Sequence, residues 1–280
     1  MTRPGAADTF PFESEGLTIR RIAAAQRADW PDGVERIEYA SAIDGQTDWA
    51  LALRPTRGDT WVVHIHGHGS KGDQIFTRPD IRDGWLPVYR RHGFGVLGVN
   101  LRGNAWMSPP AAADLHALLK FMRYHYAARR FLLISGSMGG TSNLIYATLH
   151  PEDVAAVIAL CPASDLATYH QWCRERSEPP VLREIADAIE TAYGGPPDRR
   201  EEAYDAHSAL LHAERLTMPV YVVHGSDDAI IPVEQARGLA AAAAGRETFD
   251  YLEVPGGDHE TPLSLMEPGL KWILQVLGEL

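Results

Sequence analysis

A serine between small residues follows an apolar segment near the middle of the chain. The segment 131–135 reads Phe-Leu-Leu-Ile-Ser, and Ser137 comes directly after Gly136, with Gly139 two residues further on. Small residues two before and two after a serine permit the tight strand-to-helix turn that lifts its hydroxyl above a sheet. A helix that begins at Met138 would aim the amide of that residue at a developing oxyanion. The pattern favours Ser137 as a nucleophile over a serine that merely caps a helix.

A serine hydroxyl is a weak nucleophile until a base takes its proton. Two partners lie downstream: Asp228, after the apolar segment 220–224, and His259, in a loop after the last apolar segment. Nucleophile, acid and base follow each other in this order in one known hydrolase arrangement. Asp227 competes for the acid position, but we favour Asp228 and expect its neighbour to brace the turn. We therefore predict a catalytic triad of Ser137, Asp228 and His259.

The loop after segment 60–66 supplies a second candidate for oxyanion binding. It reads His66-Gly67-His68-Gly69-Ser70, and its glycines let the backbone turn amides inward. We assign the backbone N–H of His68 as one donor of an oxyanion hole and that of Met138 as the other. The His68 side chain is a secondary candidate for the pocket wall.

These residues need a sheet that brings strand ends together. Apolar periodicity predicts strands at 34–42, 47–53, 60–66, 95–99, 131–135, 154–160, 220–224 and 249–254. Helices are predicted at 82–92, 111–127, 138–149, 233–244 and 264–280. This alternation predicts an α/β fold, a mostly parallel central sheet flanked by helices, with ligands at the carboxyl ends of its strands. We expect an N-terminal extension over 1–30, one domain over 31–280, and a short cap-like helical insertion over 162–217, after the sixth core strand.

Over residues 34–280 the chain resembles the α/β-hydrolase superfamily. The resemblance rests on His66-Gly67, the run 135–139, the run 224–228 (His-Gly-Ser-Asp-Asp) and His259. Residues 100–104 resemble the loop after the family's fourth strand, and 204–232 resemble the serine-esterase and prolyl-oligopeptidase-like branch. The chain departs from the commonest turn by carrying Ser135 where glycine is usual. The resemblance implies a Ser-His-Asp hydrolase, most often of carboxylic esters, and the family also contains peptidases.

Several rival interpretations stay open at this stage. A peptidase or amidase of the prolyl-oligopeptidase-like type is the main alternative to an esterase. His64 and His66 alternate along a strand and so share one face, which suits a metal-dependent hydrolase. A non-catalytic binding protein would need a broken triad, and a thiol nucleophile at Cys161 is less plausible than a small buried hydrophobe. The substrate pocket is predicted to include three aromatic residues: Trp106, Tyr169 and Trp172.

Composition bounds the remaining possibilities. The chain has 280 residues, 45% of them hydrophobic, and a net charge of −11 from 26 basic and 37 acidic residues. An acidic balance argues against a nucleic-acid partner, which needs a positive field. Neither a signal peptide within 1–12 nor an apolar run long enough for a membrane span is evident, so we expect a cytoplasmic protein. We expect a small acyl substrate, no metal and no cofactor; no oligomeric state is predicted.

Overall fold

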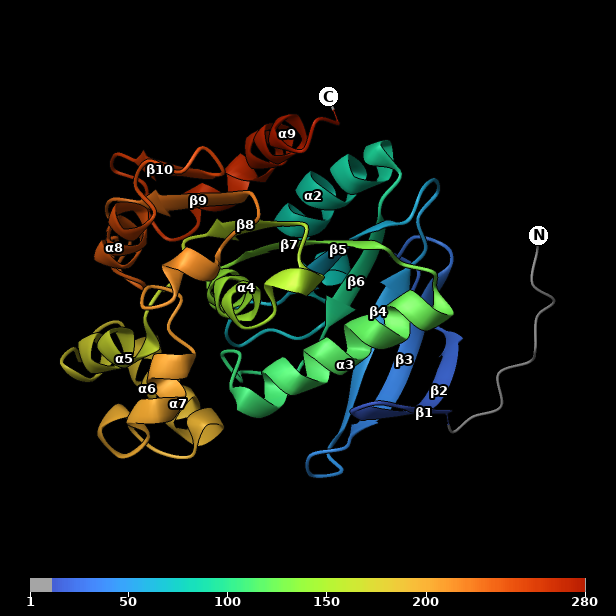
Figure 1. The fold of residues 1–280 in the computed structure, drawn as a ribbon, viewed down its shortest axis with the longest axis horizontal. Coiled ribbons are helices and arrows are strands. Elements are labelled where there is room, and N and C mark those ends of the chain that lie inside the picture. The colour runs from blue at the N-terminus through green and yellow to red at the C-terminus, as the bar shows by residue number, and fades with distance from the viewer. Residues whose placement is uncertain (1–11, 280) are drawn as a thin grey trace.

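Ten strands form one sheet within residues 12–279, which the computed structural model describes (Figure 1). Their order across the sheet is β1-β2-β3-β4-β6-β5-β7-β8-β9-β10. The pairs from β1 to β6 are antiparallel, and those from β6 to β10 are parallel. The strands are β1 (Phe12–Ser14), β2 (Leu17–Ala24), β3 (Val34–Ser41), β4 (Thr47–Leu53), β5 (Thr60–Ile65), β6 (Gly95–Val99), β7 (Arg130–Gly136), β8 (Ala156–Leu160), β9 (Val220–Gly225) and β10 (Phe249–Val254). The carboxyl ends of the parallel strands therefore meet at one edge.

Helices cover both faces of this sheet. One core packs α2 and α9 against it, and the other packs α3, α4 and α8 against the opposite face (Figure 1). The helices are α1 (Gln74–Thr77), α2 (Pro79–His92), α3 (Pro109–His125), α4 (Met138–Leu149), α5 (Leu166–Arg174), α6 (Val181–Tyr193), α7 (Glu201–Ala206), α8 (Glu234–Ala242) and α9 (Met266–Val276). Short 3-10 turns lie at η1 (Pro151–Asp153), η2 (Pro197–Arg199), η3 (Ala213–Arg215) and η4 (Thr261–Leu265). The α/β architecture with a mainly parallel sheet is confirmed.

The first thirty residues differ from the predicted extension. Residues 12–24 form β1 and β2, which join the sheet through antiparallel pairing with β3. Leu17 and Ile19 are fully buried against the sheet's core, and this burial outweighs the local excess of polar residues. The alternation is too short and too interrupted by Arg20 and Arg21 to be read from the sequence. Residues 1–11 lie outside the described residues.

The long connection between β8 and β9 is helical. It contains α5, α6 and α7, so the segment 162–217 follows the eighth strand of the sheet once β1 and β2 are counted. In α6 the apolar residues recur at helical spacing, and Leu182, Ile185 and Ile189 are buried. They join the same core cluster as α3 and α4. The connection therefore packs onto the body of the protein and places α6 near the carboxyl edge of the sheet.

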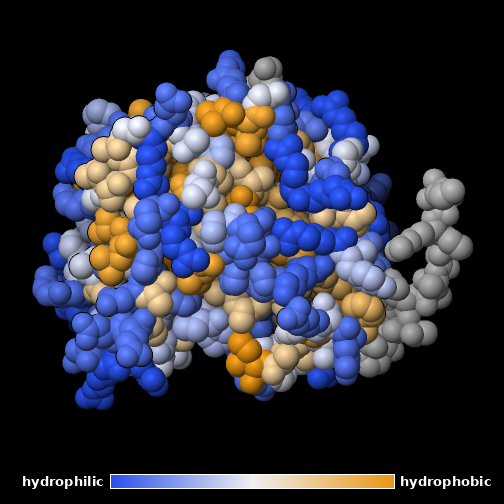
Figure 2. All heavy atoms as spheres, in the orientation of Figure 1, coloured by the Kyte–Doolittle hydropathy of each residue, from blue (hydrophilic) through white to orange (hydrophobic). Residues whose placement is uncertain are grey.

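The face of the molecule that is seen in Figure 2 is mostly polar. Figure 2 shows a largely hydrophilic face with scattered apolar groups. Among the described residues, the large hydrophobic side chains that are exposed are Ile43, Tyr124, Leu211, Leu252 and Val276. Single exposed hydrophobic residues are ordinary on globular proteins. Within residues 12–279, no helix combines the length and the hydropathy that crossing a bilayer requires.

Candidate active site

Ser137 occupies the sharp turn between β7 and α4. Its φ is 57° and its ψ is −129°, a conformation that costs a non-glycine residue about 1–3 kcal/mol. The turn is held because the Ser137 amide donates to the Leu160 carbonyl oxygen at 2.8 Å. A Cβ on Gly139 would lie 2.0 Å from the Ile65 carbonyl oxygen, so only glycine fits there. Ser135, which replaces the usual glycine, accepts a hydrogen bond from the Ile65 amide at 2.9 Å and ties the turn to β5.

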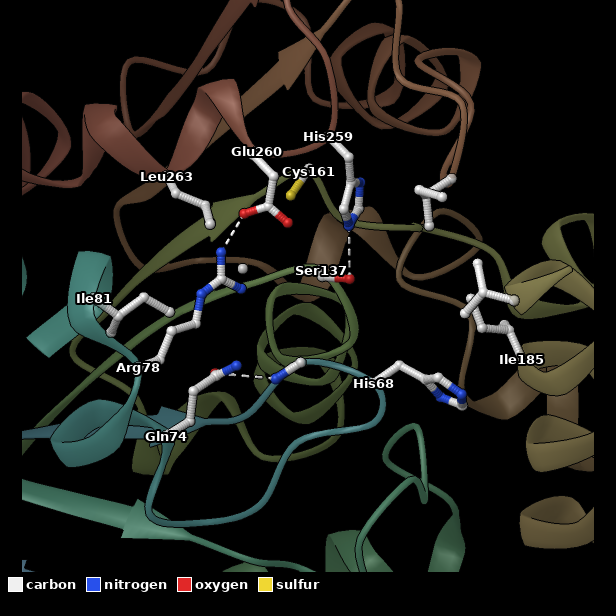
Figure 3. A pocket seen from close by; sticks show the side chains of 14 residues that line it. His68, Gln74, Arg78, Ile81, Ser137, Cys161, Ile185, His259, Glu260 and Leu263 are labelled. Carbon is white, nitrogen blue, oxygen red and sulfur yellow. Dashed lines mark hydrogen bonds and ion pairs between the residues drawn. The ribbon is translucent and has the colours of Figure 1, made fainter. Parts of the chain in front are cut away.

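His259 lies between Ser137 and Asp228, although the three come from three different strand ends. Its Nε2 is 2.9 Å from the Ser137 Oγ (Figure 3). Its Nδ1 is 2.7 Å from the Asp228 Oδ2. The other Asp228 oxygen accepts the amides of Ile230 and Ile231 at 2.8 and 2.9 Å. The fold thus supplies a histidine whose two ring nitrogens face a hydroxyl and a fully buried carboxylate.

The neighbouring aspartates have other partners. Asp227 is exposed and accepts a hydrogen bond from the Ser226 hydroxyl at 2.8 Å. Asp258, next to the histidine in sequence, accepts bonds from the backbone amides of Glu260 and Thr261 and so caps the turn that follows. The structure therefore places Asp228, and neither neighbour, against the His259 ring.

Contacts among Asp228, His224, His259 and Cys161 shift the pKa values of Asp228 and His259. Burial raises the pKa of Asp228, but hydrogen bonds from His224 and His259 outweigh that effect and the pKa lies well below its usual range. Burial opposes a charge on His259, whereas the Cys161 sulfur and the Asp228 carboxylate favour it, and the pKa of His259 is raised above 6.5. An ionised Asp228 therefore stabilises a proton on His259.

Two backbone amides lie free beside Ser137. In the loop after β5, the Gly67 amide donates to the Gln74 Oε1 at 3.1 Å and the Gly69 amide donates to the Asn104 Oδ1 at 2.9 Å. Among the described residues, the amides of His68 and Met138 have no hydrogen-bond acceptor, and Met138 opens α4 directly after Ser137. Both residues predicted as oxyanion donors therefore have an unpaired backbone N–H. Met138 follows Ser137 in the chain, and His68 lines the same cavity as Ser137.

A cavity of about 200 Å³ opens over Ser137 and His259 (Figure 3). Its wall is apolar where α2, α6 and η4 approach, and polar where Gln74, Arg78 and Glu260 face it. Arg78 pairs with Glu260 across the cavity and with Asp80. The apolar wall consists of Ile81, Val181, Ile185, Ile230 and Leu263.

The three aromatic residues predicted for the pocket lie behind its wall. Trp106 and Tyr169 are buried, and neither they nor Trp172 borders the cavity beside Ser137. Trp106 donates from its indole to the His68 ring at 3.3 Å, and Tyr169 packs against both tryptophans. Trp106 and the aromatic side chains of the insertion bury large areas against one another, which places Trp106 and Tyr169 in the core and off the cavity surface. The prediction that these residues line the pocket is therefore corrected, and the residues of α6 take that place.

His64 on β5 and His66 directly after that strand have structural partners. The ring nitrogens of His64 lie 3.3 Å from the Ile134 carbonyl oxygen and 3.2 Å from the Gln74 Oε1. Burial lowers the pKa of His64 to about 4, so its ring is neutral at pH 7. The ring nitrogens of His66 lie 2.8 Å from the Gly67 carbonyl oxygen and 3.1 Å from the Asn100 carbonyl oxygen. These contacts position the loop after β5 and leave no preformed metal site at the pair.

Four residues near the reacting groups were missed by sequence reasoning: Gln74, Arg78, His224 and Glu260. Gln74 begins the short helix α1 and Arg78 directly follows that helix, and neither belongs to a recognisable motif, so only the folded chain places them. His224 carried a signal, because it opens the run 224–228 and ends a buried strand. Its Nε2 lies 3.2 Å from the Asp228 Oδ2.

The fold agrees with comparisons to known proteins. Residues 60–190 match a family model described as the alpha/beta hydrolase fold. This match and the fold support the assignment of the chain to the α/β-hydrolase superfamily. The chain is 29% identical to the esterase LipC of Mycobacterium tuberculosis over 232 residues, which cover 75% of the chain and 55% of that esterase. It is 22% identical to dipeptidyl peptidase family member 6 of Caenorhabditis elegans, covering 82% of the chain and 32% of that protein.

Solved structures with the same fold include peptidases and esterases. A puromycin-hydrolyzing peptidase of Mycobacterium tuberculosis superposes with a TM-score of 0.65 at 19% identity, covering 94% of the chain and 46% of that protein. The Pyrococcus furiosus esterase Pf2001 superposes with a TM-score of 0.65 at 13% identity, covering 91% of the chain and 97% of that esterase. The chain thus spans about half the length of LipC and a third of the dipeptidyl peptidase, but nearly all of the smaller esterase. At these identities the superpositions establish the fold.

Proposed function

We propose that this α/β-hydrolase is a serine hydrolase that cleaves carboxylic esters through an acyl-enzyme. One observation carries the proposal: the His259 ring lies 2.9 Å from the Ser137 hydroxyl on one side and 2.7 Å from the buried Asp228 carboxylate on the other. This arrangement suits a base that takes the serine proton while an ionised acid stabilises the imidazolium.

The proposed reaction has two halves. Ser137 Oγ attacks the acyl carbonyl carbon as His259 Nε2 takes its proton, and the amides of His68 and Met138 bind the resulting oxyanion. His259 then gives the proton to the leaving alkoxide, and the acyl group stays on Ser137. A water molecule attacks this ester with His259 again as the base, and the acid is released. These steps use only groups of the chain and water.

The cavity supports a small acyl substrate. Its volume of about 200 Å³ and its wall of Ile81, Ile185 and Leu263 suit a short apolar acyl chain. We expect activity on short-chain p-nitrophenyl esters to exceed activity on long-chain esters, because a long chain would extend beyond the apolar wall of this cavity.

Peptide or amide cleavage is the second candidate. The similarity to a dipeptidyl peptidase and to a puromycin-hydrolyzing peptidase favours it, because the same three residues can expel an amine. The two candidates are separated by comparing kcat/KM for p-nitrophenyl butyrate with that for aminoacyl p-nitroanilides, using one preparation. A higher value for the ester supports an esterase, and a higher value for the anilides favours the peptidase.

The decisive variant is Ser137→Ala, with Ser264→Ala as a matched control. Ser264 is exposed on η4, so its removal leaves the proposed chemistry intact. We expect Ser137→Ala to lower kcat by about 10⁴–10⁶-fold and the control to retain full activity. Equal ester hydrolysis by the two variants would refute the nucleophile.

A further inference from the structure

A thiol that the proposed reaction does not use lies beside the reacting histidine. Cys161 follows β8 directly, has a φ of 46°, and is fully buried from bulk solvent, yet it borders the cavity. Figure 3 shows its sulfur next to the His259 ring. Its position is fixed from behind, because the Cys161 amide donates to the Val223 carbonyl oxygen at 2.7 Å. The sulfur is therefore held at the cavity by the sheet itself.

Three chemically different ligand atoms converge at this point. The Cys161 Sγ, a ring nitrogen of His259 and a carboxylate oxygen of Asp228 all lie within 4.8 Å of one another. A thiolate, an imidazole and a carboxylate are the ligands that Zn²⁺ takes in proteins, and three protein ligands with one open position are common for zinc. We propose that Cys161, His259 and Asp228 form an inhibitory binding site for a thiophilic divalent cation such as Zn²⁺ or Cd²⁺. The inhibition, though not the binding, rests on the proposed function.

Small side-chain movements bring the three ligand atoms within bonding distance of one metal ion. Metal–ligand bonds of about 2.0–2.3 Å in tetrahedral geometry place ligand atoms roughly 3.3–3.7 Å apart. The present separations of up to 4.8 Å therefore require side-chain shifts of about 1 Å. The Asp228 carboxylate supplies one negative charge, and the Cys161 thiol supplies a second when it releases its proton to solvent on binding. The cavity offers the ion an entry path and a fourth position for water.

A metal ion bound at this site must inhibit the proposed ester hydrolysis. His259 Nε2 faces Ser137, and His259 Nδ1 faces Asp228. An ion takes one of these two nitrogens, so one of the two hydrogen bonds is lost whichever it takes. The ring then lacks either the serine it deprotonates or the acid that stabilises its proton.

A second group of metal-ligating residues is less suited to this role. It lies at the other end of α4, about 18 Å along that helix, and consists of His116, His150, Glu152 and Asp153. The rings of His116 and His150 stack at 4.1 Å with only 14° between their planes. One ion cannot lie in both ring planes at once. Asp153 is also committed to Tyr146 and Arg123 at 2.6 and 2.7 Å.

The first measurement is Zn²⁺ titration of ester hydrolysis by protein freed of metal with a chelator. We compare Cys161→Ala and Cys161→Ser with Cys173→Ala, each scaled to its own metal-free rate. Cys173 is the other buried cysteine, it lies on α5, and burial raises the pKa of its thiol to about 11. We expect reversible inhibition of the wild type and of Cys173→Ala by Zn²⁺ and Cd²⁺ but not by Mg²⁺. Both Cys161 variants should need at least about tenfold more Zn²⁺ for half-inhibition.

The second measurement does not depend on activity. Co²⁺ added to Ser137→Ala protein should produce the near-ultraviolet band of a cobalt–thiolate bond, and the same variant with Cys161→Ala should lack it. A band without ester hydrolysis by the wild type would support the site and overturn the proposed function. Ester hydrolysis with equal Zn²⁺ sensitivity in both Cys161 variants, or with no Cys161-dependent band, would overturn the site and leave the proposed function standing.

Discussion

The His224 ring donates to the same Asp228 oxygen that faces His259. Its Nε2 lies 3.2 Å from the Asp228 Oδ2 and 2.9 Å from the Ile231 carbonyl oxygen. Both neighbours are acceptors, so this nitrogen carries the proton. His224 is fully buried, and its hydrogen bond favours the ionised form of Asp228. One carboxylate is thus held between two histidines, of which only His259 reaches the cavity.

We predict that His224→Ala lowers kcat/KM for an ester about tenfold. A hydrogen bond to a charged group is worth about 1.5–3 kcal/mol, and its loss leaves Asp228 free to turn away from His259. His224→Gln, which keeps a donor, should recover part of the activity. Steady-state kinetics on folded protein test this, and full activity of His224→Ala would exclude a positioning role for this ring.

The pH dependence of the reaction should follow His259. The base must be neutral, and the pKa of His259 is raised above 6.5, so kcat/KM should fall as the pH drops through that raised pKa. In Asp228→Asn the charge that favours protonation is gone, so the acid limb should move to lower pH while kcat falls about 10⁴-fold. Initial rates from pH 5 to 10 measure both effects. An acid limb that Asp228→Asn leaves in place would contradict the coupling of the two residues.

Gln74 holds the loop that carries the His68 amide. Its Oε1 accepts from the Gly67 amide at 3.1 Å and faces His64 at 3.2 Å. Gln74→Ala should lower kcat about tenfold with little change in KM, because the donor is needed most in the transition state. Gln74→Glu retains the acceptor and serves as the control. A rise in KM with unchanged kcat would instead make Gln74 a residue of ground-state binding.

Arg102 is structural. Its side chain is 9% exposed and its Nε lies 2.6 Å from an oxygen of Asp114, which is buried, while Asp44 binds the outer end of the guanidinium. Arg102→Ala leaves Asp114 as a buried charge without its partner, so we expect the free energy of unfolding to fall by about 3–5 kcal/mol. Urea unfolding measures the change. Adding Asp114→Asn should restore part of the loss, and a loss below about 1 kcal/mol in Arg102→Ala would contradict this role.

The sequence predicts the strand ends better than the cavity. The strands 47–53, 95–99 and 249–254 and the helix 138–149 agree with the prediction to the residue, because apolar periodicity and Gly or Pro breaks mark the ends of these elements. Parallel strands share one carboxyl edge, so the meeting of Ser137 and His259 followed from chain order alone. Chain order does not predict which residues line the cavity beside Ser137. Ile185 faces the cavity and Trp106 does not, and only tertiary packing decides which apolar side chain is outermost.

The central claim is that Ser137 attacks and His259 activates it, and covalent labelling tests it most directly. Intact-protein mass spectrometry after treatment with a fluorophosphonate, followed by peptide mapping, reads both roles at once. We predict one adduct per wild-type chain, located on Ser137, with none in Ser137→Ala and slow labelling in His259→Ala. Undiminished labelling of Ser137→Ala, or an adduct mapped to another residue of the wild type, would contradict the account.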